Sequence, residues 1–155
     1  MKKSVDNVNH AGRHGDDDVL ELVHAVMHLY RSEQYQVLRD GPHDVTHMES
    51  KVLGYFGRHP GMTLSDLVQH SGRDKAQLAR LIKSLRERGL LDAQADAADR
   101  RNLRLSLTAD GQAVQRALQQ QAKKVGAKAV AGLSAAEREE LRALLQRVRR
   151  NLGSE

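Results

Sequence analysis

The chain has 155 residues, of which 39% are hydrophobic, and carries a formal net charge of +5 at pH 7. This length suits one domain, or two small lobes that share a core, and the absence of cysteine excludes disulfides and cysteine-based redox sensing. No apolar run is long enough to span a membrane, and residues 1–15 are polar and lack the apolar segment of a signal peptide. The sequence therefore predicts a cytoplasmic protein that begins with a flexible tail.

The first predicted helix starts in the acidic run at Asp16 and ends before Gly41, which is followed by a proline. Its apolar residues recur with helical spacing, as Val19, Leu22, Val23, Val26, Leu29, Tyr30 and Val37. The next helix is predicted from the stretch T-H-M-E, which begins at Thr46 and has the pattern of a capping box. A second box of the form T-L-S-D begins at Thr63 and opens a short helix that ends near Gly72.

A further helix begins at Asp74, so two short helices joined by a tight turn predict a helix-turn-helix. In the second of these helices, Leu78, Leu81, Ile82 and Leu85 share one predicted buried face. The side chains predicted to point outward are Lys75, Gln77, Arg80, Lys83 and Ser84. Such basic and amide groups suit the DNA major groove, where arginine and lysine contact guanine and glutamine contacts adenine. An ordinary solvated helix surface is the alternative interpretation.

Two short strands follow, in L-L-D-A-Q and N-L-R-L-S-L-T, around a loop at residues 96–101. A helix-turn-helix followed by a hairpin is a winged helix, and we expect the tip of this wing to reach the minor groove. Arg101 suits a narrow minor groove because negative potential is concentrated there, and Asp99 can hydrogen-bond this arginine and orient it. Arg100 and Arg104 complete the predicted DNA-contacting set. A flexible, solvated hairpin tip is the alternative.

Two helices complete the chain, one from Thr108 towards Gly132 and one opened by a capping box that begins at Ser134. Their apolar stripes comprise Val114, Leu118, Ala122, Val125, Ala129, Leu133, Leu141, Leu144, Leu145, Val148 and Leu152. We expect no single subunit to cover these stripes, so two-fold pairing would bury them and place two recognition helices about 34 Å apart. The predicted division is a dimerisation helix at 16–45, a winged helix at 46–108 and dimerisation helices at 109–155. A helical hairpin packed within one chain is the alternative.

The histidines form two pairs, His24 with His28 on the first helix and His43 with His47 at the start of the second. Ordinary polar roles are one interpretation of these histidines, and His24, His28, Tyr30 and His47 are the candidates for a ligand pocket. The four histidines could instead bind a metal ion, which would make the chain a metal-responsive regulator, although no metal ligand or cofactor is assigned. No Gly-rich phosphate loop or H-E-x-x-H motif is present, so an enzyme is not expected; a winged-helix module for protein interaction stays open.

The stretch L-A-R-L-I-K-S-L-R-E-R-G-L-L-D-A-Q-A-D-A-A-D-R-R-N-L-R-L-S-L-T-A-D-G resembles the MarR family of bacterial transcription regulators. The resemblance implies a mainly α fold with a small β-hairpin wing, combining a winged helix-turn-helix with a helical dimerisation region. It implies a homodimer that binds double-stranded DNA at a pseudo-palindromic operator, usually as a repressor released by a small ligand such as an aromatic acid. By position, Arg101 matches the minor-groove arginine of the family, Asp99 its orienting partner and Arg80 a DNA-contacting residue.

Overall fold

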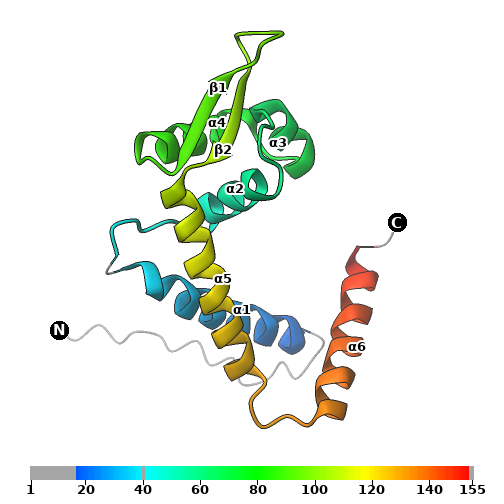
Figure 1. Cartoon of the computed structure of the whole chain (residues 1–155). Helices are drawn as coiled ribbons and strands as arrows, with labels where there is room; N and C mark the ends of the chain where they lie inside the picture. The colour runs from blue at the N-terminus through cyan, green and yellow to red at the C-terminus, as the bar shows by residue number, and fades with distance from the viewer. Residues whose placement is uncertain (1–16, 40, 154–155) are drawn as a thin grey trace, which may run out of the picture.

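The computed structural model describes residues 17–39 and 41–153, and this part of the chain is mainly α-helical with one β-hairpin (Figure 1). In chain order, the elements are α1 (Asp17–Arg39), α2 (His47–Arg58), α3 (Leu64–Ser71), α4 (Lys75–Glu87), β1 (Leu91–Ala95), β2 (Leu103–Leu107), α5 (Ala109–Ala129) and α6 (Ala135–Leu152). The predicted fold class is therefore confirmed, whereas the predicted tail at 1–15 lies outside the described residues. None of the described helices is long and apolar enough to cross a bilayer.

Side-chain caps explain where most of the helices begin. Thr63 and Ser134 form complete capping boxes, in which the N-cap side chain accepts from the third residue and the acid of that residue accepts from the N-cap amide. At Thr46 only half of the predicted box forms: the Thr46 hydroxyl accepts from the amide of Glu49 at 3.2 Å. The Glu49 carboxylate instead pairs with Arg88, because a guanidinium forms a stronger hydrogen bond with a carboxylate than a backbone amide does.

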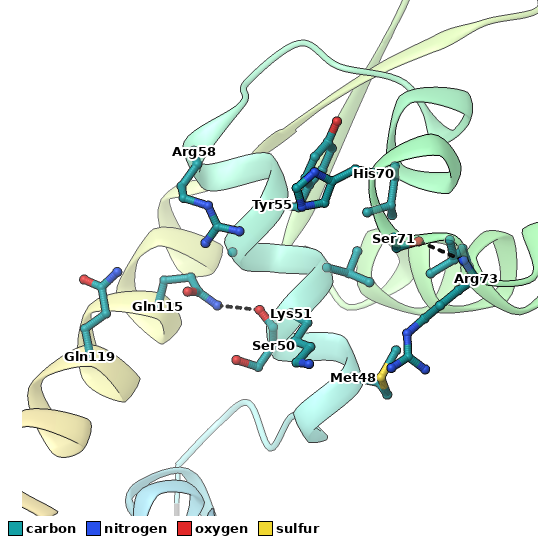
Figure 2. Close-up of a pocket in the computed structure, with 14 residues that line it drawn as sticks. Met48, Ser50, Lys51, Tyr55, Arg58, His70, Ser71, Arg73, Gln115 and Gln119 are labelled. Atoms are coloured by element: carbon teal, nitrogen blue, oxygen red, sulfur yellow. Dashed lines mark hydrogen bonds between the residues drawn. The ribbon is translucent and has the colours of Figure 1, made fainter. Parts of the chain in front are cut away.

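The core forms where α2, α3, α4, the hairpin and the first half of α5 meet. Its fully buried side chains include Phe56, Leu53, Leu78, Leu85, Leu90 and Leu105. Burial of each such side chain stabilises the fold by roughly 1.5–3 kcal/mol. Val114 and Leu118 carry α5 into the same cluster, and the Gln115 side chain donates to the carbonyl of Ser50 at 3.1 Å (Figure 2). The winged helix and the start of α5 thus share one core.

The wing is an antiparallel pair in which Leu91 lies opposite Leu107 and Ala95 opposite Leu103. The alternation predicted for its second strand holds at Leu105, which is 2% exposed, but Leu103 near the tip is 38% exposed because little of the domain lies beneath it. The loop before α3 pairs with β2 as well: Leu105 donates to the Met62 carbonyl at 2.9 Å and accepts from the amide of Gly61 at 2.8 Å. This third segment fixes the base of the wing against α3.

The junctions at the base of the wing depend on two glycines, Gly89 before the first strand and Gly111 after the second. Gly89 adopts a left-handed conformation with φ of 71°, which ends α4 and turns the chain into β1. The Thr108 hydroxyl donates to the Gly89 carbonyl at 2.6 Å and accepts from the amide of Gly111 at 3.0 Å. A Cβ at Gly111 would lie 2.2 Å from the carbonyl oxygen of Leu90. Only glycine at position 111 allows the start of α5 to lie so close to the backbone of Leu90, which connects α4 to β1.

The two terminal parts of the chain differ in how their apolar faces are covered. α1 lies against α5, where Val125 is buried and Lys128 forms an ion pair with Glu33 at 2.8 Å. The prediction that the α5 stripe lacks cover within one subunit is therefore wrong. α6 contains no buried residue and turns away from α5 (Figure 1), so the alternative of an intramolecular α5–α6 hairpin is also wrong.

Candidate nucleic-acid interface

The exposed side of α4 carries the predicted base-reading residues. Asp74 caps the helix by accepting from the amide of Gln77 at 3.1 Å, and the leucine-rich face packs on the core. As a result, Lys75, Gln77, Arg80 and Lys83 are exposed. Ser84 is half-buried instead of pointing freely outward, because it lies at the edge of the buried face beside Leu81. Lys75 and Arg80 have no ion-pair partner in the described part of the chain, so their charges are available to a ligand.

The tip of the wing holds Arg101 beside Asp99. One carboxylate oxygen of Asp99 accepts from the Arg101 amide at 3.1 Å and from its Nε at 3.2 Å. The Arg101 side chain remains 92% exposed, so its terminal guanidinium nitrogens stay free. Arg100 is also exposed, and its ion-pair partner is not found among the described residues. The carboxylate therefore restricts the arginine without neutralising its outer edge, which reduces the entropy lost on binding.

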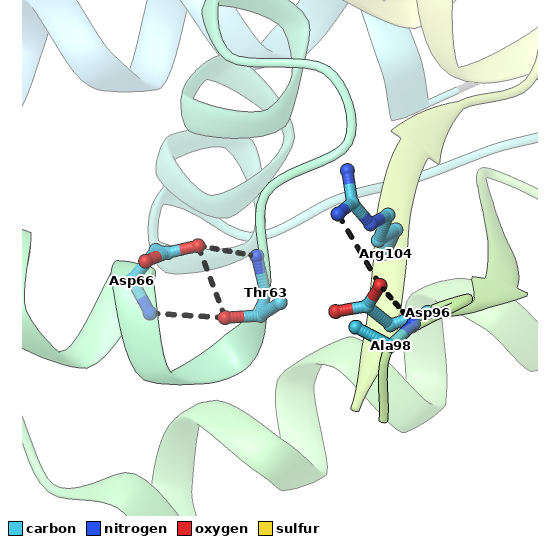
Figure 3. Close-up of polar contacts among 5 residues, drawn as sticks. All are labelled: Thr63, Asp66, Asp96, Ala98 and Arg104. Carbon is cyan, nitrogen blue, oxygen red and sulfur yellow. Dashed lines mark hydrogen bonds and ion pairs between the residues drawn. The ribbon is translucent and has the colours of Figure 1, made fainter. Parts of the chain in front are cut away.

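Asp96, which the sequence analysis did not single out, organises the strand end of the same loop (Figure 3). Its carboxylate accepts from the amide of Ala98 at 3.2 Å and from the Arg104 guanidinium at 3.3 Å. The amide hydrogen bond, with a smaller contribution from Arg104, holds the pKa of Asp96 below its usual value. An aspartate that bonds to the backbone two residues ahead is a recognisable turn signal. Arg104 is thus an exposed basic residue that already has a partner within the wing.

The other unpredicted contact links the end of α4 to the start of α2. Arg88 pairs with Glu49 and also donates to the carbonyl of Asp44 at 2.7 Å. The Glu49 side chain is only 13% exposed. Because 39 residues separate Glu49 from Arg88, no local pattern could have revealed the pair. It ties the recognition helix to the segment that leads back to α1.

A hollow of about 640 Å³ lies over the outer side of α2, between α3 and α5 (Figure 2). Lys51, Arg58, His70 and Arg73 line it together with Tyr55, glutamines and serines, and none of its described lining residues is acidic. His24, His28, Tyr30 and His47, which were predicted to form the ligand pocket, do not line this hollow. Sequence reasoning missed it because its walls come from four separate helices.

The predicted pocket residues lie at different places. His24 and His28 are exposed on α1, and Tyr30 lines a separate hollow of about 510 Å³ between α1 and α5. His47 is hydrogen-bonded through Nδ1 to the Tyr35 hydroxyl at 3.0 Å. Burial, followed by the positive charges of Arg31, Lys51 and Arg73, lowers the pKa of His47, so we expect it to be neutral near pH 7.

The alternative of a four-histidine metal site is not supported within one subunit. His43 faces Asp110 at 3.6 Å, whereas the His47 ring packs edge-on against Tyr35. Across residues 17–39 and 41–153, no three histidine, aspartate or glutamate side chains lie close enough to share a metal ion. The two histidine pairs therefore do not meet, because each side chain of the second pair has its own partner.

A helix-turn-helix with an exposed basic face, followed by a hairpin that presents an oriented arginine, defines a winged-helix DNA-binding protein. Residues 43–102 match a family model described as MarR family. Over this segment, which comprises the winged helix as far as the start of β2, the chain is similar to the MarR family of transcription regulators.

Two relatives with similar sequences bear the names of transcription regulators. A putative transcriptional regulatory protein for the hcr operon of Thauera aromatica is 29% identical over 153 residues, covering 91% of this chain and 92% of the relative. The HTH-type transcriptional regulator PetP of Rhodobacter capsulatus is 29% identical over 76 residues, which is 49% of this chain and 46% of that protein.

Solved structures agree on the fold. FabT of Streptococcus pneumoniae, in complex with DNA, superposes with a TM-score of 0.75 at 18% identity, covering 88% of this chain and 96% of that one. BpsR of Bordetella bronchiseptica, in a structure concerned with regulation of its DNA binding by 6-hydroxynicotinic acid, gives a TM-score of 0.63 at 27% identity, covering 84% and 98%.

Proposed function

We propose that this regulator is a homodimeric repressor that reads a pseudo-palindromic operator with α4 and the adjacent minor groove with its wing. The observation that carries the proposal is the exposed row of Lys75, Gln77, Arg80 and Lys83 on α4. It is supported by Arg101, which Asp99 holds at the wing tip. Arg100, Arg104 and Ser84 belong to the same proposed surface. Occupation of an operator that overlaps a promoter would exclude the polymerase.

The experiment is selection of a binding site from random duplexes, followed by titration of Arg80→Ala. We expect a loss of about 1–3 kcal/mol on the selected site, because a bidentate arginine–guanine contact is of that size. Arg116→Ala is the matched control, because it removes the same charge from an exposed position of α5. Equal affinity of Arg80→Ala and wild type would contradict the assigned orientation of α4. Failure to select any site, together with capture of a protein partner, would favour an interaction module.

Dimerisation is proposed through 16–45 and 109–155, with 46–108 left to bind DNA. The supporting observation is the bare apolar surface of the terminal helices, where Leu22, Leu29 and Leu152 are 65%, 64% and 72% exposed. Exposed apolar side chains grouped on a helix often mark a protein–protein interface. Light scattering of the intact chain should give twice the subunit mass, and deletion from Ala135 onward should give a monomer or an insoluble product. A well-folded dimer from the truncated chain would exclude α6 from the interface.

We further propose that a small aromatic acid releases the operator by binding the hollow over α2. Three permanent cations, Lys51, Arg58 and Arg73, face a carboxylate-sized ligand there, while Tyr55 and Leu67 supply apolar contact. The regulation of BpsR by 6-hydroxynicotinic acid supports this ligand class. Operator release should be tested with benzoate, salicylate and 6-hydroxynicotinate against wild type and Arg58→Gln. Release that is equally efficient in both would place the ligand elsewhere, including the hollow that Tyr30 lines.

A further inference from the structure

A second basic hollow, of about 330 Å³, runs between α4 and the wing and ends at the beginning of α3. Its polar lining comprises Lys75, Lys83 and Arg86 from α4, Arg101 and Asn102 from the wing, and Thr63 and Ser65 at the start of α3. None of its described lining residues is acidic, so four cations face one narrow space. Arg86 is an exposed basic residue of α4 that has no role in the base-reading surface proposed above.

The position of this hollow determines what can occupy it. In B-DNA, a major groove and the adjacent minor groove are separated by one sugar–phosphate strand. If α4 lies in the major groove and Arg101 in the neighbouring minor groove, that strand must pass between the helix and the wing. The hollow occupies the space between these two elements, and its charges are complementary to a phosphodiester.

Arg86 is the cation best placed to bind that strand without reading bases. It lies eleven residues after Lys75, three helical turns further along the same side of α4, and this side faces the wing. Lys83 is 3.9 Å from Glu87 and Arg101 is 3.2 Å from Asp99, whereas Arg86 forms no ion pair with any described residue. Arg86 also lines another hollow, with Glu87 of α4 and Asp92 of β1, whereas the hollow that it shares with Arg101 and Asn102 has no acidic residue among its described lining.

We propose that the hollow between α4 and the wing binds the phosphodiester backbone of DNA, with Arg86 as its phosphate-binding residue. This inference rests on the proposed operator binding. Phosphate contacts fix register and orientation but carry no sequence information. Arg86 therefore contributes equally to binding of the operator and of unrelated duplexes, in contrast to Arg80.

The experiment compares wild type, Arg86→Gln, Arg86→Lys and the control Arg116→Gln by fluorescence anisotropy over a range of KCl concentrations. Each protein is titrated with the selected operator duplex and with a scrambled duplex of the same length, and thermal unfolding is recorded for each variant. One lost phosphate contact per subunit makes the slope of log K against log[KCl] less negative by about 0.9, or about 1.8 for a dimer on two half-sites. If wild type and variant bind equally at 1 M KCl, a slope difference of about 1.8 makes the variant complex roughly 30-fold weaker than the wild-type complex at 0.15 M.

We expect Arg86→Gln to lose affinity for both duplexes by the same factor, while Arg86→Lys and Arg116→Gln keep the wild-type slope. A wild-type slope in Arg86→Gln, a loss confined to the operator, or an equal loss in Arg86→Lys would each overturn the assignment. These results differ from failure of the proposed function itself, in which wild type would bind the operator no better than the scrambled duplex.

Discussion

Replacement of Gly111 by alanine perturbs the closest backbone approach in the fold. The added methyl would lie 2.2 Å from the Leu90 carbonyl oxygen and 3.2 Å from its carbon, far inside contact distance. Leu90 is fully buried, so the strain must move α5 or the start of β1. Such overpacking costs about 1–3 kcal/mol, and each of the two hydrogen bonds that join Thr108 to Gly89 and Leu90 contributes about 1 kcal/mol.

We therefore expect a loss of roughly 3 kcal/mol, which for a protein of this size lowers Tm by roughly 6–12 °C. Urea unfolding and calorimetry at one fixed protein concentration provide the measurement, because the stability of the proposed dimer would depend on concentration. Gly126→Ala on the same helix is the control: no atom lies within 4 Å of its added Cβ, so helix propensity predicts a gain of up to about 1 kcal/mol. If Gly111→Ala is as stable as wild type, the reasoning about the junction is refuted.

Three further predictions concern titration, the buried ion pair and the wing. The pKa of His47 is lower in the folded than in the unfolded chain, so the unfolded chain binds the proton first and stability falls as pH drops from about 7.5 to about 5.5. Urea melts should show a smaller fall in stability for His47→Gln than for wild type. An equal fall in both proteins would contradict this role of His47. Arg88→Met leaves Glu49 without its partner and should cost about 2 kcal/mol, with partial recovery in the Glu49→Gln double variant measured by the same melts. Arg101→Ala should weaken binding most where A·T-rich steps flank the half-site, and Asp99→Ala less; the reverse order, without misfolding, would refute the wing assignment.

The parts of the fold that depend on neighbouring residues were predictable from the sequence. The boxes at Thr63 and Ser134, the alternation around Leu105 and the spacing of the α4 leucines are local patterns, and each specifies its element with little help from the rest of the chain. The hydrogen bond by which Asp99 orients Arg101 is also local, because the two residues are two positions apart in the sequence.

The remainder depends on contacts between distant segments. The capping pattern at Thr46 predicted the start of α2 correctly but predicted the wrong partner for Glu49. The carboxylate of Glu49 pairs with Arg88, 39 residues away, and not with the amide of Thr46. The cover of the α5 stripe by α1 could not be distinguished from cover by a second subunit, because an apolar stripe does not specify which helix it meets. The walls of the hollow over α2 come from four helices, and no local pattern in the sequence shows that these helices meet there.

α5 connects the winged-helix core to α1, so a movement at one end of this helix displaces the other end. Its first half, with Val114 and Leu118, is part of the winged-helix core, and its second half rests on α1 through Val125 and Lys128. With 21 residues it is about 31 Å long, so a tilt of about 5° at the α1 end displaces the wing end by about 2.7 Å. A hydrogen bond to a base does not survive such a displacement. In the proposed dimer, a change at the terminal helices too small to alter any packing in the core would therefore be enough to move both recognition helices out of register with the DNA.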